Sequence, residues 1–211
     1  MKNILKSQEE VDRWEEAMFL YDSALKKMTL KAKIMNDEFV HRYRYNPIEH
    51  IKSRLKTADS IVRKLQQDGY EVTIDNMNAK LSDIAGVRII CSFTSDIYQI
   101  AEMISNQSDI NVISVKDYIV NPKQSGYKSY HMLVTVPVYL SDRIEQTKVE
   151  IQIRTVAMDF WASLEHKIHY KFEGNAPDSI RDQLVECSRI VSDLDARMLN
   201  LNKEIQQLGE R

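Results

Sequence analysis

The chain has 211 residues, of which 43% are hydrophobic and 28% are charged. This length and balance predict one domain that buries its own hydrophobic core, rather than a disordered or fibrous protein. The 29 basic and 31 acidic residues nearly cancel, which argues against a protein that binds nucleic acid through an overall positive field. An anionic ligand must therefore be met by a local basic cluster.

Cysteine usage and hydropathy favour a cytoplasmic protein. Cys91 and Cys187 each fall in an apolar pattern, which predicts reduced, packed thiols rather than a disulfide. The N-terminus becomes charged by Glu9 and Glu10 and so lacks a signal peptide, and no apolar run reaches transmembrane length. Neither a membrane nor DNA is an expected partner.

The first 45 residues predict one long amphipathic helix. Ser7 and Glu10 fit a capping box, and apolar residues then recur at helical spacing from Val11 to Met35. A second helix is predicted over residues 46–69, with Asn46 as the cap, because proline follows it and glycine ends the pattern.

The apolar pattern changes to strand alternation at Ile84. The expected elements that follow are a first strand from Ile84 to Phe93, a helix over 95–106, strands over 111–119, 131–138 and 149–154, and a helix over 155–171. Residues 46–172 therefore form the expected catalytic core, an α+β fold whose mixed β-sheet is flanked by N- and C-terminal helices.

Residues 178–211 predict a long helix with an unbroken heptad seam. Its members alternate steps of four and three: Ile180, Leu184, Cys187, Val191, Leu194, Met198, Leu201, Ile205 and Leu208. The seam could pack on the chain's own sheet or first helix. A contact between subunits is favoured, because the seam is longer than one sheet edge needs.

One strand displays an unusual polar row. Val149, Ile151 and Ile153 predict its buried face, and Glu150, Gln152 and Arg154 alternate with them. Half-buried strands with a solvated polar face are common. A carboxylate, an amide and a guanidinium in a row can also hold a metal, a base and a phosphate.

Two more clusters precede this strand. A basic cluster lies on the predicted second helix and comprises Lys52, Arg54, Lys56, Arg63 and Lys64. Such a run is usually a solvated face. Asp83 then precedes the first strand and Arg88 lies inside it, which suits a Mg²⁺ ligand and a phosphate ligand, although Asp before a strand is often only a turn residue.

The connection from Lys123 to His131 is rich in donors and rings. A hairpin loop explains its glycine and serines. Its two lysines, two tyrosines and histidine also suit a stacked base and its phosphates. No Walker loop, dinucleotide fingerprint, Cys-x-x-Cys pair or His-Glu-x-x-His motif offers another site.

With these residues in view, the chain resembles the small alarmone synthetases, stand-alone relatives of the RelA/SpoT synthetase domain, and especially their RelP branch. The resemblance is collinear over roughly residues 46–171. It rests on Asn-Pro-Ile-Glu-His-Ile-Lys-Ser-Arg at 46–54, Asp-Ile-Ala-Gly-Val-Arg at 83–88, and the segments 126–131, 150–155 and 158–166. The long RelA/SpoT proteins add domains that 211 residues cannot hold.

The resemblance implies a GTP pyrophosphokinase, which transfers the pyrophosphoryl group of ATP to the 3′-hydroxyl of GDP or GTP and makes ppGpp or pppGpp with AMP. The implied catalytic and Mg²⁺-binding residues are Asp83 and Glu150, with Glu150 also activating the hydroxyl. The implied ATP ligands are Arg54, Lys56 and Arg88. The implied GDP or GTP ligands are Lys123, Tyr127 and His131, with Gln152 and Arg154 in support. Mn²⁺ is an expected substitute, and the assembly implied is a homotetramer.

Two departures from the family pattern affect regulation and binding. Ser125 stands where the family often has Asn, which puts a contact of that side chain in doubt. His50 replaces an aromatic residue of the RelQ branch in a region linked there to activation by pppGpp, and with Lys52 it predicts weak stimulation here. Regulation by RNA stays open. Zn²⁺ is a predicted inhibitor, if Asp83, Glu150 and His131 converge.

Two rival interpretations share this fold. One is a nucleotide- or RNA-binding regulator without activity, since a fold alone does not determine function. The other is a nucleotidyl- or phosphotransferase with a different acceptor. The presence of both Asp83 and Glu150 argues against the inactive regulator.

Overall fold

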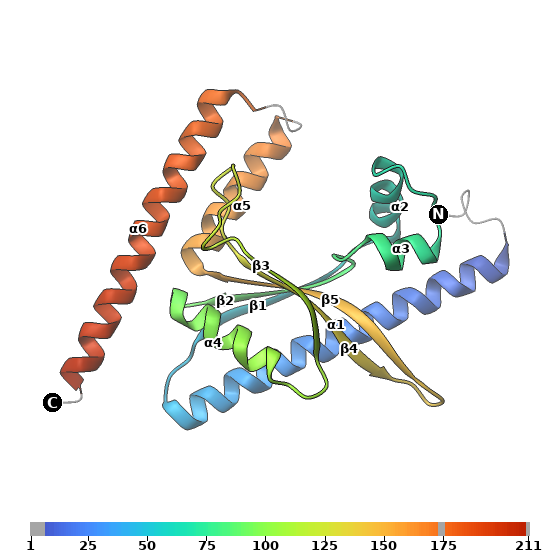
Figure 1. Cartoon of the computed structure of the whole chain (residues 1–211), viewed down its shortest axis with the longest axis horizontal. Helices are drawn as coiled ribbons and strands as arrows, with labels where there is room; N and C mark the ends of the chain where they lie inside the picture. The colour runs from blue at the N-terminus through green and yellow to red at the C-terminus, as the bar shows by residue number, and fades with distance from the viewer. Residues whose placement is uncertain (1–6, 173–175, 210–211) are drawn as a thin grey trace.

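The structure, a computed structural model, describes residues 7–172 and 176–209 (Figure 1). The outer ends of the predicted terminal helices, residues 1–6 and 210–211, lie outside the described residues. The elements in chain order are α1 (Gln8–Tyr43), β1 (Ile48–Leu55), α2 (Ala58–Gln67), α3 (Ile74–Lys80), β2 (Ala85–Cys91), α4 (Thr94–Ser105), β3 (Asn111–Asp117), β4 (Tyr130–Tyr139), β5 (Ile144–Thr155), α5 (Val156–Lys171) and α6 (Asp178–Gly209).

The five strands form one mixed sheet in the order β1-β2-β5-β4-β3. β2 and β5 run parallel, and the other neighbours are antiparallel. α1 and α4 lie on one side of this sheet and α5 lies on the other, while α2 and α3 lie beyond the strands, where α3 contacts α1 (Figure 1). The predicted α+β fold with terminal helices is confirmed, and its central strands leave one sheet face open to ligands.

α1 forms as its sequence predicts. The Ser7 hydroxyl caps the helix by accepting a hydrogen bond from the Glu10 amide at 3.2 Å. Trp14 and Met28 are almost fully buried against the sheet, as the helical spacing indicates. None of the described helices is long and apolar enough to cross a membrane.

The prediction of one helix over residues 46–69 is wrong. Residues 48–55 form β1, which pairs antiparallel with β2, and helix α2 begins only after Thr57, whose hydroxyl accepts from the Ser60 amide at 3.3 Å. The apolar spacing of Ile51 and Leu55 fits a helix, which is why the segment was predicted to be helical. Its hydrogen-bonded pairing with β2 makes it a strand. Lys52 and Arg54 consequently share one face of a strand.

Two smaller differences concern α3 and a cysteine. The short helix α3 was not predicted, because seven residues give too few turns to show a period. Cys91 is buried as expected, but Cys187 is exposed, so only the first is a packed thiol.

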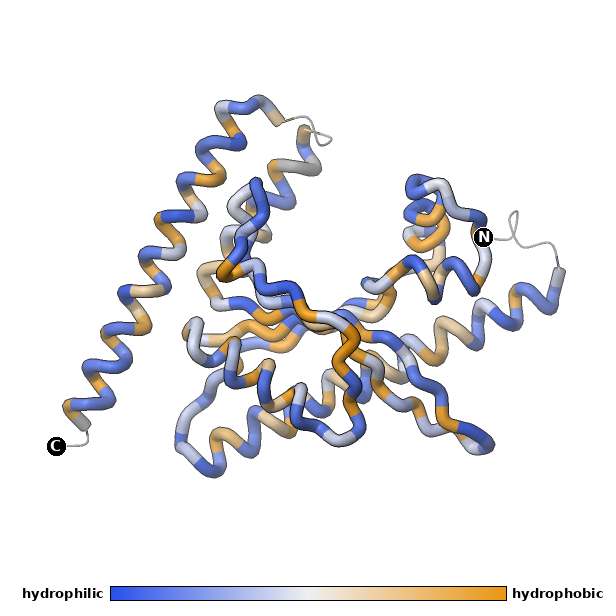
Figure 2. The backbone as a smooth tube through the Cα atoms, viewed as in Figure 1, coloured by the Kyte–Doolittle hydropathy of each residue, from blue (hydrophilic) through white to orange (hydrophobic). Residues whose placement is uncertain are grey.

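The seam of α6 is uncovered over its second half. Leu194, Met198, Leu201 and Ile205 are 48–66% exposed, and apolar residues recur along the outer part of the helix in Figure 2. One chain therefore does not bury this stripe. Assembly through the seam stays a prediction.

Candidate active site

A polar row crosses the open face of the sheet. Lys52 pairs with Arg88, Arg88 with Gln152, Gln152 with His131, and His131 with Lys116, so one residue from each of the five strands stands in register. Directly paired residues project from the same face of a sheet. Residues separated by 100 positions in sequence are thereby brought into one line.

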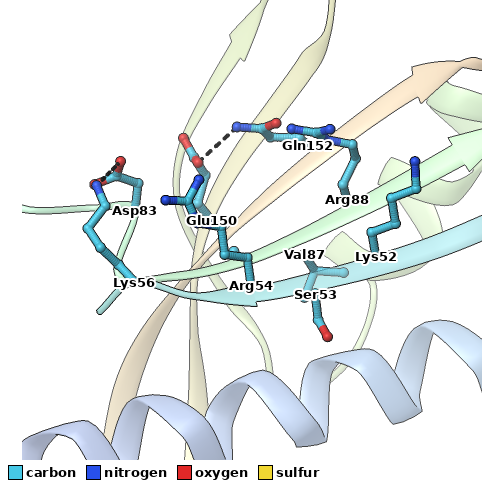
Figure 3. A pocket seen from close by; sticks show the side chains of 10 residues that line it. Lys52, Ser53, Arg54, Lys56, Asp83, Val87, Arg88, Glu150 and Gln152 are labelled. Atoms are coloured by element: carbon cyan, nitrogen blue, oxygen red, sulfur yellow. Dashed lines mark hydrogen bonds and ion pairs between the residues drawn. The ribbon is translucent and has the colours of Figure 1, made fainter. Parts of the chain in front are cut away.

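The second row of the same face borders a cavity of about 370 Å³. Arg54, Gly86 and Glu150 are paired across β1, β2 and β5. The cavity is lined by the predicted ATP and metal residues together: Arg54, Lys56, Asp83, Arg88 and Glu150, with Lys52 and Gln152 beside them (Figure 3). The three predicted ATP ligands and the two carboxylates thus meet at one opening.

Asp83 is held by two lysines at the edge of this cavity. Its carboxylate accepts hydrogen bonds from Lys56 Nζ at 2.6 Å and from Lys64 Nζ at 3.0 Å. Burial by itself would raise the pKa of Asp83, but these hydrogen bonds and charges outweigh it and hold the pKa below its ordinary value. The carboxylate is therefore ionised at neutral pH.

Glu150 is also ionised, through different neighbours. Burial opposes its charge, but the nearby His131 ring, 3.5 Å from Nδ1 to Oε1, and the Gln152 amide, 3.0 Å from Oε2, lower the net pKa of Glu150. Asp83 acts in the opposite direction and raises it. Two carboxylates that sense each other's charge across a cavity are a donor set suited to a hard divalent cation.

The residues of the predicted acceptor site form an aromatic cluster beside β4. The Tyr127 hydroxyl and His131 Nε2 lie 2.8 Å apart in a hydrogen bond, and Lys123 Nζ lies 5.1 Å from the centre of the Tyr127 ring. Sequence reasoning missed Tyr118, whose ring packs edge-on to His131 with centroids 5.2 Å apart. Its signal was its place at the end of the β3 pattern, one connection away from Lys123.

A second cavity, of about 270 Å³, opens beside this cluster. Tyr118, Lys123, His131 and Lys116 line it, and so does Glu150. Glu150 therefore borders both cavities, one with the predicted ATP ligands and the other with two of the five predicted GDP or GTP ligands, Lys123 and His131. A group that is transferred from a ligand in one cavity to a ligand in the other must pass close to a residue that lines both cavities.

Arg154 is not displayed as the strand pattern predicted. It lies on the same face of β5 as Gln152, but the residue is covered there and only 3% exposed. It donates to Gln152 Oε1 at 2.9 Å and to the Tyr127 hydroxyl, and its guanidinium lies 4.9 Å from the centre of that ring. Arg154 therefore holds the Tyr127 and Gln152 side chains in place, and its role toward the guanine nucleotide stays a prediction.

Asp159, in the first turn of α5, was missed altogether. Its carboxylate accepts from Lys52 at 3.2 Å, Arg88 at 3.2 Å and Arg154 at 3.3 Å, which come from β1, β2 and β5. Arg88 Nε is buried and has no hydrogen-bond partner among the described residues. One buried carboxylate thus orients two cations of the larger cavity, Lys52 and Arg88, together with the buried Arg154.

We expect Asp159→Asn to lower the free energy of unfolding by about 3 kcal/mol, because Arg154 would keep its buried charge without a counterion. Thermal unfolding measures this change. Asp182→Asn, which alters an exposed aspartate of α6, is the matched control. Equal melting temperatures for the two variants would show that Asp159 is not the anchor of this cation cluster.

The remaining predicted features lie away from the two cavities or apart from each other. Ser125 faces a pocket between the loop, α5 and α6, and His50 is exposed on β1. Within residues 7–172 and 176–209, no group of three or more His, Cys, Asp or Glu side chains is placed to hold a metal ion. Asp83, Glu150 and His131 therefore do not form the three-ligand set that the zinc hypothesis required.

Comparisons with known proteins show the family of the chain. The family profile described as the region found in RelA/SpoT proteins matches residues 53–175. GTP pyrophosphokinase YwaC of Bacillus subtilis is 46% identical over 195 residues, which cover 92% of this chain and 93% of that protein.

Solved structures show the same fold. Small alarmone synthetase 2 of Bacillus subtilis superposes with a TM-score of 0.82 at 45% identity, covering 90% of this chain and 98% of the other. Small alarmone synthetase 1 of the same organism, solved with its product pppGpp, gives 0.85 at 34% identity and covers 92% and 99%. The same synthetase bound to AMPCPP gives 0.78 at 32% identity and covers 93% and 99%. The chain therefore belongs to the RelA/SpoT family, and within it is similar in length and fold to the small alarmone synthetases.

Proposed function

We propose that the chain is a GTP diphosphokinase, which transfers the β,γ-pyrophosphoryl group of ATP to the 3′-hydroxyl of GDP or GTP and releases AMP. The observation that carries this proposal is the position of Glu150 on the wall shared by the two cavities. The relatives support the substrates: they include a GTP pyrophosphokinase and a synthetase solved with pppGpp and with AMPCPP.

ATP occupies the larger cavity in this proposal. Arg54 and Arg88 stack on the adenine or pair with phosphate oxygens, since a guanidinium is planar and offers several donors. Lys56 neutralises charge at the triphosphate, and Lys64, which shares Asp83 with it, adds to this field.

GDP or GTP occupies the smaller cavity. Tyr127 stacks on guanine, and the Arg154 guanidinium behind its ring keeps the ring in place. Lys123 and His131 contact the acceptor's phosphates, and Tyr118 adds a ring edge to the same wall. Gln152 orients Glu150 through its amide hydrogen bond.

Asp83 and Glu150 are the proposed ligands of a Mg²⁺ ion, for which Mn²⁺ can substitute. When bound, the ion would supply positive charge to the triphosphate oxygens and complete its coordination with water and phosphate. The two ionised carboxylates on one cavity wall fit this hard cation. Lys56 and Lys64 hold Asp83 ionised, so no proton has to leave it first.

The transfer itself is a displacement at phosphorus. Glu150 accepts the proton of the 3′-hydroxyl, whose oxygen forms a bond to the β-phosphorus of ATP. The bond from that phosphorus to the bridging α-oxygen breaks, and AMP leaves with the electron pair. The lowered pKa of Glu150 keeps it deprotonated before the reaction. The arginines and lysines around the cavity offset the charge of the transferred group.

The proposal also includes the setting of the reaction. We place it in the cytoplasm, where ATP and GTP are available, in a homotetramer that buries the seam of α6. Stimulation by pppGpp is expected to be weak, because His50 is exposed and Lys52 is bound to Asp159.

Incubation of the protein with ATP labelled at the β- or γ-phosphate and with GDP, GTP or GMP tests the function directly. We expect the label to move to the guanine nucleotide and unlabelled AMP to form in equal amount. Binding of nucleotides without transfer would favour the inactive regulator. Label on another acceptor, or AMP without a guanine product, would favour a different transferase.

A further inference from the structure

The acceptor loop, residues 123–131, is held by α6. Ser188 Oγ, buried within the contact, donates to the Gly126 carbonyl at 2.5 Å. Two residues further along the loop, Lys128 Nζ donates to Ser192 Oγ at 2.7 Å. Through these two hydrogen bonds, α6 holds the loop that the family resemblance assigns to the guanine nucleotide.

The fit at Gly126 is close. Its φ of +88° lies in the left-handed region, and a Cβ atom there would come within 2.8 Å of Ser188 Cβ and 3.4 Å of Val185 Cα. A glycine permits both this conformation and this approach. The loop therefore lies against α6 in one defined arrangement.

The gripping face of α6 is itself fixed to the core. Ser188, Ser192 and Asp195 follow at steps of four and three and so form one polar stripe. Thr155, the last residue of β5, donates to Asp195 Oδ2 at 2.6 Å, and Trp161 Nε1 of α5 donates to the Leu184 carbonyl at 2.9 Å. These contacts place the stripe relative to the strand that carries Glu150.

The contact reaches the acceptor side of the site alone. Tyr127, the next residue after Gly126, hydrogen-bonds His131 and lies over the Arg154 guanidinium. None of the gripping residues lines the larger cavity, which belongs to the donor side. Loss of the hydrogen bonds between α6 and the loop would therefore move Tyr127 and leave Arg54 and Lys56 in place.

We propose that α6 positions the acceptor loop, with Ser188 as the positioning residue that fixes Gly126 and so the ring of Tyr127 for the guanine nucleotide. This inference rests on the proposed function for the identity of the acceptor. It assigns to the C-terminal helix a role inside each subunit, separate from the exposed seam on its other residues.

Ser188→Ala tests the proposal through kinetics. We expect KM for GDP to rise by about 3- to 10-fold, the effect of losing one buried neutral hydrogen bond. KM for ATP and kcat at saturation should stay within about twofold of the wild type. Ser179→Ala, at an exposed serine of the same helix, is the matched control. Equal rises in both KM values, or no rise, would overturn the proposal.

Two measurements do not depend on turnover. The dissociation constant of a fluorescent GDP analogue should rise with the KM for GDP, and hydrogen exchange in peptides from residues 123–131 should quicken in Ser188→Ala. Ser192→Ala, which removes the second grip, should change both in the same direction. If the wild type binds GDP but makes no alarmone, the proposed function fails, whereas unchanged binding and exchange in both variants refute the positioning role alone.

Discussion

Glu150→Gln is expected to lower kcat by about 10²-fold or more, while the dissociation constant for ATP changes little. The amide keeps the shape of the side chain and its place beside His131 and Gln152. It cannot accept the proton of the 3′-hydroxyl, and it brings no negative charge to the wall between the two cavities. Rapid-quench measurement of a single turnover separates this chemical step from product release.

Glu145→Gln provides the matched control for this variant, because it makes the same change on the same strand, where Glu145 pairs with Arg143 at 2.9 Å. Its turnover should equal that of the wild type. Near-normal single-turnover rates in Glu150→Gln would exclude Glu150 as the base. Loss of ATP binding in the same variant would point instead to a role in holding the donor.

Asp83→Asn is expected to raise the Mg²⁺ concentration for half-maximal activity by about tenfold and to lower kcat/KM for ATP by about 10²-fold. The amide is a weaker ligand for a hard cation than the carboxylate. It also leaves Lys56 and Lys64 without the charge that they share. Electron paramagnetic resonance of Mn²⁺ bound with a non-hydrolysable ATP analogue reports the ligand change without turnover.

The Asp83→Asn variant should also change how the free energy of unfolding depends on pH in the acid range. Because the folded-state pKa of Asp83 is lowered, its ion pairs stabilise the protein above its unfolded pKa of about 3.9, and this contribution is lost as pH falls through the folded pKa. Below about pH 5 the free energy of unfolding should therefore fall less steeply with decreasing pH in Asp83→Asn than in the wild type. Identical pH dependence in both proteins would show that these ion pairs contribute nothing. Asp59→Asn, which makes the same change at an aspartate of the first turn of α2, serves for comparison.

Most of the helices and strands, and the residues around the larger cavity, could be predicted from strong local sequence patterns. α1 and α6 follow from long apolar periodicities, and β5 follows from strict alternation around Glu150. The chemistry of Asp83, Glu150, Arg54, Lys56 and Arg88 could be suspected from residue type and order. The structure then places all five around one cavity.

The wrong or missed predictions concern segments whose local sequence pattern is weak or fits more than one structure. Residues 46–55 have apolar spacing that suits a helix, and their strand state depends on hydrogen bonds with β2, which lies 30 residues later. Asp159 looked like an ordinary charge in a helix. Only the packing of α5 beside the sheet brings Lys52, Arg88 and Arg154 to its carboxylate.

The sequence by itself determined the long helices, the polar face of β5 and the membership of this chain in a family with recognisable motifs. Each of these features depends on residues that are close to one another in the sequence. Strand register, by contrast, is a long-range property. It decided that Lys52, Arg88, Gln152 and His131 form one row and that Glu150 borders both cavities. The burial of Arg154 and the grip of α6 on Gly126 likewise depend on contacts between distant segments, which no local pattern specifies.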